Sequence, residues 1–139
     1  MPIQVALMPL FFQVLLVFGL MIWMAMARQR ALQRGDVHSR DIALRQPAWP
    51  LKAMQVANCF ANQFELPVLF YVVTILALIT RQFDFLFLVL SWIFVLLRYV
   101  HAFIHTTSNR VSRRGLVYIL GAIVLFALWI EFALRLYLF

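Results

Sequence analysis

Residues 53–80 read AMQVANCFANQFELPVLFYVVTILALIT, an apolar stretch of 28 residues in which Glu65 is the only charged side chain. About 20 apolar residues in a helix are enough to cross the hydrocarbon core of a bilayer. Lipid offers no hydrogen-bond partners, so every backbone group must bond inside the segment, which favours a helix. The stretch therefore predicts a transmembrane helix with an acid near its middle.

Three further apolar runs have similar lengths and cover residues 1–27, 85–107 and 115–139. None shows the alternation that is typical of a membrane barrel strand. We therefore predict one all-α domain, residues 1–139, which forms an integral membrane bundle of four antiparallel helices in up-down-up-down order. The expected helices cover about residues 3–30, 51–80, 84–107 and 113–138.

The composition excludes an ordinary water-soluble domain. Hydrophobic residues make up 65% of the chain and charged residues 12%, whereas soluble domains carry about 25% charged residues. The single Cys59 excludes an internal disulfide framework and is interpreted as a small buried packing residue. The first run lacks a positive n-region and is too long for a signal peptide, so we expect it to remain as an anchor.

The basic residues predict the orientation. The first and third connections hold nine of the twelve Lys and Arg residues, which places these connections in the cytoplasm and both termini outside. Pro47 and Pro50 should end any helix before the second span. The net charge of +7 is mostly this topology signal; it attracts anionic lipid headgroups, and we expect no nucleic-acid partner. The nine residues are Arg28, Arg30, Arg34, Arg40, Arg45, Lys52, Arg110, Arg113 and Arg114.

Two of the expected helices each carry polar side chains on one face. Spacings of three, four and seven residues place side chains on the same side of a helix with 3.6 residues per turn. Intramembrane polar residues of this kind usually face a bundle interior and mark a ligand or ion path. The second span contributes Gln55, Asn58, Asn62 and Glu65, and the third contributes Asp84, Ser91, Arg98, His101 and His105.

Glu65 and Arg98 should lie at the same depth. Glu65 is 15 residues before the outer end of its run at Thr80. Arg98 is 14 residues after Asp84, where the next run begins. At about 1.5 Å per residue, both are roughly 21 to 23 Å from the outer boundary. We therefore expect the two charges to meet, which either locks the hairpin together or forms part of a polar cleft.

Arginines also gather where this cleft should open. Arg113 and Arg114 begin the fourth run, and Tyr118 shares a helical face with Arg114 because the two are four residues apart. Arg28 ends the first run on the same side. These arginines are either topology determinants or ligand contacts. Glu131 and Arg135 are also four residues apart, and we interpret them as a boundary anchor without a functional role.

The motifs NQFELP (62–67), RYVHAFIH (98–105) and NRVSRRGLVYILG (109–121) resemble the MAPEG family, the membrane-associated proteins in eicosanoid and glutathione metabolism. Together with the size and the expected topology, the resemblance covers nearly the whole chain and fits a bacterial-type member. It implies a homotrimer in the bacterial inner membrane, with sites between neighbouring subunits that glutathione enters from the cytoplasm.

The resemblance also implies roles for particular residues. Asn62 and Glu65 match the second-helix motif, in which the acid meets the amino group of glutathione. Arg114 matches the arginine that stabilises the thiolate, with Arg113 as its rival for this place. Further ligand contacts match as follows: Arg98 and His101 in the third-helix motif, Tyr118 as the companion tyrosine, and Arg28 as a first-helix arginine that meets a carboxylate.

Two positions depart from the family pattern. Asn58 occupies a place where several members have an arginine for a glutathione carboxylate, and His105 occupies one where several have a tyrosine. Both differences weaken the expectation for glutathione specifically, but not for an anionic ligand that these two side chains would contact.

The expected function is that of a glutathione transferase or peroxidase acting on lipophilic electrophiles, with Arg114 as the catalytic residue. Arginines suit carboxylates through paired hydrogen bonds, and a buried acid suits an ammonium group. One alternative is a lipid-binding or scaffold protein of the same fold without catalysis. Another is a metal site at His101 and His105, with Cys59 and Glu65 nearby, although we expect no metal.

Overall fold

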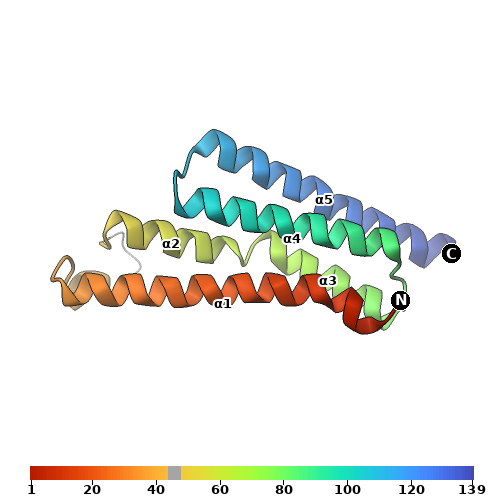
Figure 1. Cartoon of the computed structure of the whole chain (residues 1–139), viewed down its shortest axis with the longest axis horizontal. Helices are drawn as coiled ribbons and strands as arrows, with labels where there is room; N and C mark the ends of the chain where they lie inside the picture. Colours follow the sequence, from red (N-terminus) through yellow and green to blue (C-terminus); the bar gives the residue numbers. More distant parts are fainter. Residues whose placement is uncertain (44–47) are drawn as a thin grey trace.

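The computed structural model describes residues 1–43 and 48–139, so Arg45 and Pro47 lie outside the described residues. In the described part of the chain all regular structure is helical (Figure 1), as predicted. The elements are α1 (Ile3–Gln33), the short 3₁₀ helix η1 (Ser39–Ile42), α2 (Leu51–Asn62), α3 (Leu66–Ile79), α4 (Phe85–Thr106) and α5 (Val111–Leu138).

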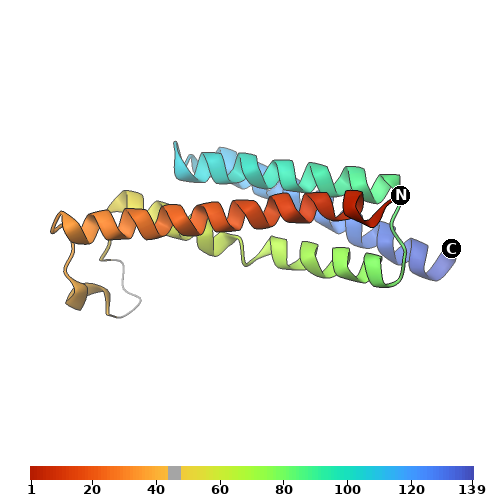
Figure 2. The ribbon, with the colours of Figure 1, turned by 60° about the horizontal axis from the view of Figure 1, so that its bottom comes forward.

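Four segments are long and apolar enough to cross a membrane: α1, the pair α2 and α3, α4, and α5. They run alternately up and down, and both termini lie at the same end of the bundle, opposite the connections that precede α2 and α5 (Figures 1 and 2). The predicted four-helix architecture is therefore confirmed. The end that holds these two connections is called the basic end below, and the other the terminal end.

The second span is not the single helix that we expected over residues 51–80. It stops at Asn62 and begins again at Leu66 (Figure 1). Pro67 supplies the physical reason, because proline has no N–H to donate and its ring clashes with the carbonyl four residues earlier. Between the two helices the backbone forms tighter bonds, from Phe64 N to Ala61 O (3.1 Å) and from Glu65 N to Asn62 O (3.2 Å).

The main apolar core lies between α3, α4 and α5. Its aromatic centre is the pair Phe70 and Phe94, with ring centroids 4.9 Å apart. A smaller cluster of Leu20, Cys59 and Ala102 joins α1, α2 and α4, which confirms Cys59 as a buried packing residue. The main core comprises Phe70, Val73, Ala77, Phe87, Phe94, Val95, Leu125, Leu128 and Phe132.

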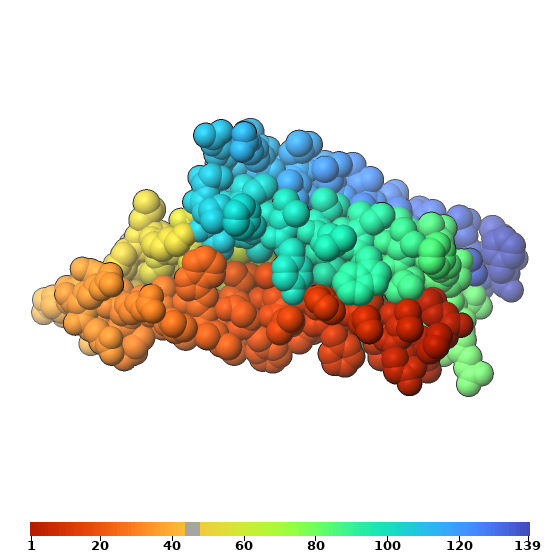
Figure 3. Space-filling model, viewed as in Figure 1, coloured from red at the N-terminus to blue at the C-terminus, as the bar shows by residue number. Residues whose placement is uncertain are grey.

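The outer surface of the bundle is also apolar. Large side chains such as Phe11, Leu15, Phe103 and Phe126 are more than half exposed. A soluble monomer rarely exposes such extended apolar area, whereas lipid is a suitable solvent for it. Figure 3 shows α1 and the connection after it extending beyond the ends of α4 and α5 at the basic end.

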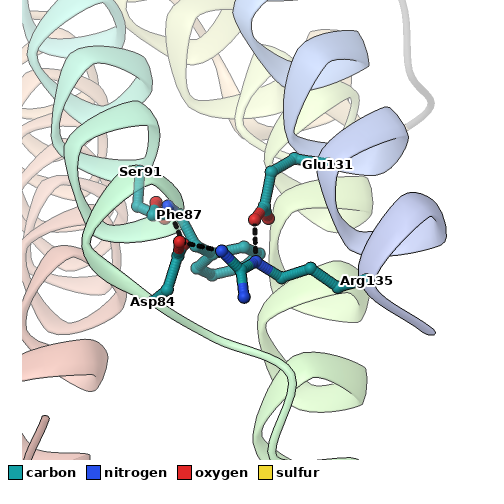
Figure 4. A network of polar contacts seen from close by, with 5 residues as sticks. All are labelled: Asp84, Phe87, Ser91, Glu131 and Arg135. Atoms are coloured by element: carbon teal, nitrogen blue, oxygen red, sulfur yellow. Dashed lines mark hydrogen bonds and ion pairs between the residues drawn. The ribbon is translucent and has the colours of Figure 1, made fainter. Parts of the chain in front are cut away.

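An ionic network closes the terminal end of the bundle (Figure 4). The guanidinium of Arg135 forms ion pairs with Glu131, as predicted, and with Asp84. Asp84 also caps α4, since its Oδ1 accepts a hydrogen bond of 2.9 Å from Phe87 N. The hydroxyl of Ser91 donates to Phe87 O. Asp84 and Ser91 therefore use their polar atoms at the start of α4 and along its backbone.

Candidate functional site

A groove of about 660 Å³ lies between α2, α4 and α5. Its volume falls in the range of about 300–1,000 Å³ that is typical of small-molecule sites. Polar and apolar side chains both line it, which suits a ligand with charged and apolar groups. The lining residues are Asn58, Ala61, Asn62, Glu65, His101, His105, Arg114, Gly115, Tyr118 and Ile119.

A chain of hydrogen bonds crosses the floor of this groove. Arg98 Nη2 donates to Asn62 Oδ1 at 2.5 Å, and Asn62 Nδ2 donates to Glu65 Oε2 at 3.2 Å. From α5, the hydroxyl of Tyr118 donates to the same carboxylate oxygen at 3.3 Å. The chain links α2, α4 and α5 at the point where the second span is broken.

The expected direct contact between Glu65 and Arg98 is wrong. Both ion pairs found among residues 1–43 and 48–139 involve Arg135 instead. The break after Asn62 changes the backbone direction at Glu65 (φ −101°, ψ −104°), so a straight helix misplaces this carboxylate. The amide of Asn62 then fills the space between the two charged groups.

Arg98 is a buried charge, with a side chain that is 1% exposed. Burying an uncompensated charge is costly, so the polar chain through Asn62 to Glu65 has an energetic role as well as a geometric one. Because Arg98 does not line the groove, it acts from behind Asn62.

His101 and His105 form the α4 wall of the groove. Both side chains are buried, and their rings meet edge to face with centroids 5.5 Å apart. The ring of His101 is also 5.8 Å from that of Tyr118. Gln55 does not enter the groove with them: its Nε2 donates to the backbone carbonyls of His105 (2.7 Å) and Thr107 (3.1 Å).

The structure distinguishes the two rival arginines. Arg114 is half-buried and lines the groove, whereas Arg113 is exposed and does not. Arg114 Nη1 donates to Asn109 Oδ1 at 2.7 Å. Asn109 has a positive φ of 48°, a conformation in which asparagine is enriched. Sequence reasoning missed Asn109, although its place just before the fourth helix was a usable signal.

Arg28 lies apart from the groove. Its guanidinium stacks over the ring of Trp49 at 5.1 Å, and it is absent from the groove lining. A second hollow of about 180 Å³ lies between α1 and α2 at the basic end. None of the predicted site residues lines this hollow, which is bordered by Trp23, Ala27, Arg30, Ala31, Arg34, Asp36, Pro50, Lys52 and Ala53.

The remaining lining residues of the groove are small or apolar. Ala61, Gly115 and Ile119 were not singled out from the sequence, because residues of these types carry no chemical signal of their own. Concerning metal binding, the described part of the chain contains no group of three or more His, Cys, Asp and Glu side chains that could hold an ion.

Comparison with models of protein families decides to which family the chain belongs. The model of the MAPEG family matches residues 6–134. The chain belongs to the MAPEG family. The match covers nearly the whole chain and every residue that lines the groove. No curated protein and no solved structure matches the chain.

MAPEG membership and the four apolar spans together make the chain an integral membrane protein. The resemblance predicted from the three motifs is confirmed at the level of the family. The groove is therefore described below as the candidate ligand site of a MAPEG protein.

Proposed function

We propose that the chain is a membrane-bound transferase or peroxidase that uses glutathione, or a closely related thiol, against lipophilic electrophiles. The observation that carries this proposal is that one groove holds the carboxylate of Glu65 and the guanidinium of Arg114. Glutathione has an ammonium group, two carboxylates and a thiol. A groove with one acid and one arginine offers an opposite charge to the ammonium and to the reacting sulfur.

Glu65 is the proposed partner of the ammonium. Its Oε2 accepts hydrogen bonds from Asn62 and Tyr118, so the carboxylate is held in place before a ligand arrives. Preorganised groups of this kind lose little freedom on binding. Asn58, His101 and His105 line the same groove and supply hydrogen-bond donors and acceptors for the rest of the peptide.

Arg114 is the proposed catalytic residue. A free thiol has a pKa of about 8.5, and a nearby guanidinium favours the thiolate. In the transferase reaction the thiol loses its proton to solvent, the thiolate sulfur bonds to the electrophilic carbon, and the leaving group departs with its electron pair. In the peroxidase reaction the thiolate attacks the peroxide oxygen, releasing an alcohol, and a second glutathione then gives the disulfide and water.

The assembly and orientation belong to the same proposal. In a homotrimer, the apolar outer faces of neighbouring bundles would pack against one another. Arg28 does not line the groove of its own chain, but it would reach the groove of a neighbouring subunit. The basic end would face the bacterial cytoplasm, where glutathione is dissolved. The lipophilic substrate would arrive through the lipid-facing side chains near Ile119.

A specific observation favours one alternative function. Asn58 lines the groove where a second arginine would meet a carboxylate, so Arg114 is the one arginine among the groove-lining residues. A lipid with a single anionic group matches this charge better than glutathione does. Non-catalytic lipid binding is therefore the second candidate.

Titration of the purified protein in detergent with glutathione, followed by thiolate absorbance, separates the two candidates. We expect saturable binding at millimolar glutathione or below, with thiolate formation in the wild type. Glu65→Gln should bind more than 10-fold more weakly, while Arg113→Ala, a matched change outside the groove, should bind as the wild type does. Absence of glutathione binding, together with co-purified lipid, would favour the non-catalytic alternative.

A further inference from the structure

Two glutamine side chains meet inside the apolar interior, at the break in the second span. Gln13 of α1 is 0% exposed, and Gln63, which follows the last residue of α2, is 1% exposed. Gln13 Nε2 donates to Gln63 Oε1 at 3.0 Å. Buried amides are costly unless they are hydrogen-bonded, so this pair links α1 firmly to the break.

Gln63 replaces a backbone bond that the break removes. In a continuous helix its N–H would bond the carbonyl of Cys59. Instead, Gln63 N donates to Phe60 O at 3.0 Å. The carbonyl of Cys59 accepts a hydrogen bond of 3.1 Å from the side chain, Gln63 Nε2. The same amide therefore satisfies the freed carbonyl with its nitrogen and binds Gln13 with its oxygen.

Pro67 explains why a break is required, but it does not by itself fix the geometry of the break. A proline only removes one donor and excludes the regular helix; several kinked backbones satisfy this condition. In the one observed here, the Gln63 side chain bonds both Gln13 and the carbonyl of Cys59. Two residues later in the chain, Glu65 directs its carboxylate towards Asn62 and Tyr118.

We propose that Gln13 and Gln63 are positioning residues, which hold the break in the conformation that presents the Glu65 carboxylate to the groove. This inference rests on the proposed function, since it assigns the pair to glutathione binding. Neither glutamine lines the groove, so both act through the backbone.

The test compares Gln13→Leu, Gln63→Leu and the double variant. Each single change leaves one amide buried without its partner, so both should lower the melting temperature in detergent. Replacing both glutamines removes the bond between them without leaving either amide unpaired, but the carbonyl of Cys59 still loses its donor. The double variant should therefore recover part of the lost melting temperature. A merely structural pair would then also recover glutathione affinity, whereas positioning residues would leave the dissociation constant at least 10-fold higher than in the wild type.

A second measurement reports the break without any ligand. Spin labels at the exposed positions Leu51 and Ile79, introduced as cysteines in a Cys59→Ala background and diluted with unlabelled protein, give the distance between the ends of the second span. We expect a shifted or broader distance distribution in the double variant. Thr74→Val is the control, because it removes a buried hydroxyl that bonds only its own helix, and it should change neither affinity nor distance.

Two results would overturn the inference: wild-type affinity in a stable double variant, or a distance distribution that superimposes on that of the wild type. Failure of the wild type to bind glutathione would instead refute the proposed function. In that case the spin-label distances still decide whether the glutamine pair holds the break.

Discussion

Arg98 reaches the carboxylate of Glu65 only through the amide of Asn62, which accepts from the guanidinium at 2.5 Å and donates to the carboxylate at 3.2 Å. The orientation of this amide is fixed by its neighbours, because the oxygen must face the donor and the nitrogen the acceptor. Asn62 therefore links the buried guanidinium of Arg98 to the carboxylate in the groove by hydrogen bonds, and it keeps the two ionic groups apart.

Asn62→Leu should destabilise the protein strongly. The change removes the hydrogen-bond acceptor of the buried Arg98 guanidinium, and hydrogen bonds to charged groups contribute about 1.5–3 kcal/mol. We expect a loss of that size in the free energy of unfolding, measured by denaturation in mixed micelles. Asn58→Leu is the matched control one turn earlier and should cost much less. Equal losses in the two variants would contradict the role assigned to Asn62.

The sequence was sufficient to predict the spans because four long apolar runs leave few other structures possible in lipid. It also placed Asn62, Glu65, His101, His105 and Tyr118 on faces that the fold brings to one groove. Helical spacing succeeds for Asn62, His101, His105 and Tyr118 because these four belong to regular helices, whereas Glu65 lines the groove from a non-helical backbone position.

The same reasoning failed where the helix is irregular. Pro67 was visible, but the assumption of one continuous helix over residues 51–80 predicted a direct contact between Glu65 and Arg98. The position of a break depends on which side chain satisfies the freed carbonyls, here Gln63 with Gln13 from another helix. Such a tertiary contact has no periodic signal in the sequence. The role of Asp84 as a helix cap is different: it is a local contact to Phe87 N, and an Asp directly before an apolar run is a readable cap signal, but the prediction assigned Asp84 to the polar face instead.

Arg114→Ala should lower turnover far more than glutathione binding. If the guanidinium stabilises the thiolate, its loss removes an electrostatic interaction of the reacting sulfur, and losses of about 10²–10³ in kcat are typical of such groups. Steady-state kinetics with a lipophilic electrophile, together with the thiolate absorbance of the bound peptide, measure both effects. An Arg114→Ala variant that loses affinity but keeps kcat would be one in which the arginine only binds the ligand. Arg113→Ala is the control, since Arg113 is exposed and does not line the groove, and it should keep the kcat and affinity of the wild type.

Asp84→Ala should weaken the terminal end of the bundle. It removes the cap of α4 and one of the two acids that bind Arg135. Loss of a cap costs about 1 kcal/mol, with an upper range near 2 kcal/mol. Thermal or denaturant unfolding in detergent should show a loss of this size, with glutathione affinity unchanged because the network is remote from the groove. Asp41→Ala, an exposed acid in η1, should have little effect on stability.

Asn109 has two roles that different substitutions can separate: its side chain bonds Arg114, and its backbone adopts a positive φ. Its φ of 48° is easily adopted by glycine but is strained for alanine, and its side chain accepts from Arg114 at 2.7 Å. Asn109→Gly should therefore keep wild-type stability while lowering turnover several-fold, because the guanidinium is free to leave the groove. Asn109→Ala should lower turnover to a similar extent and also destabilise by about 1 kcal/mol or more. Melting temperatures and kcat of the two variants, measured side by side, check both expectations. Unchanged turnover in a stable Asn109→Gly variant would show that Arg114 keeps its place without this hydrogen bond.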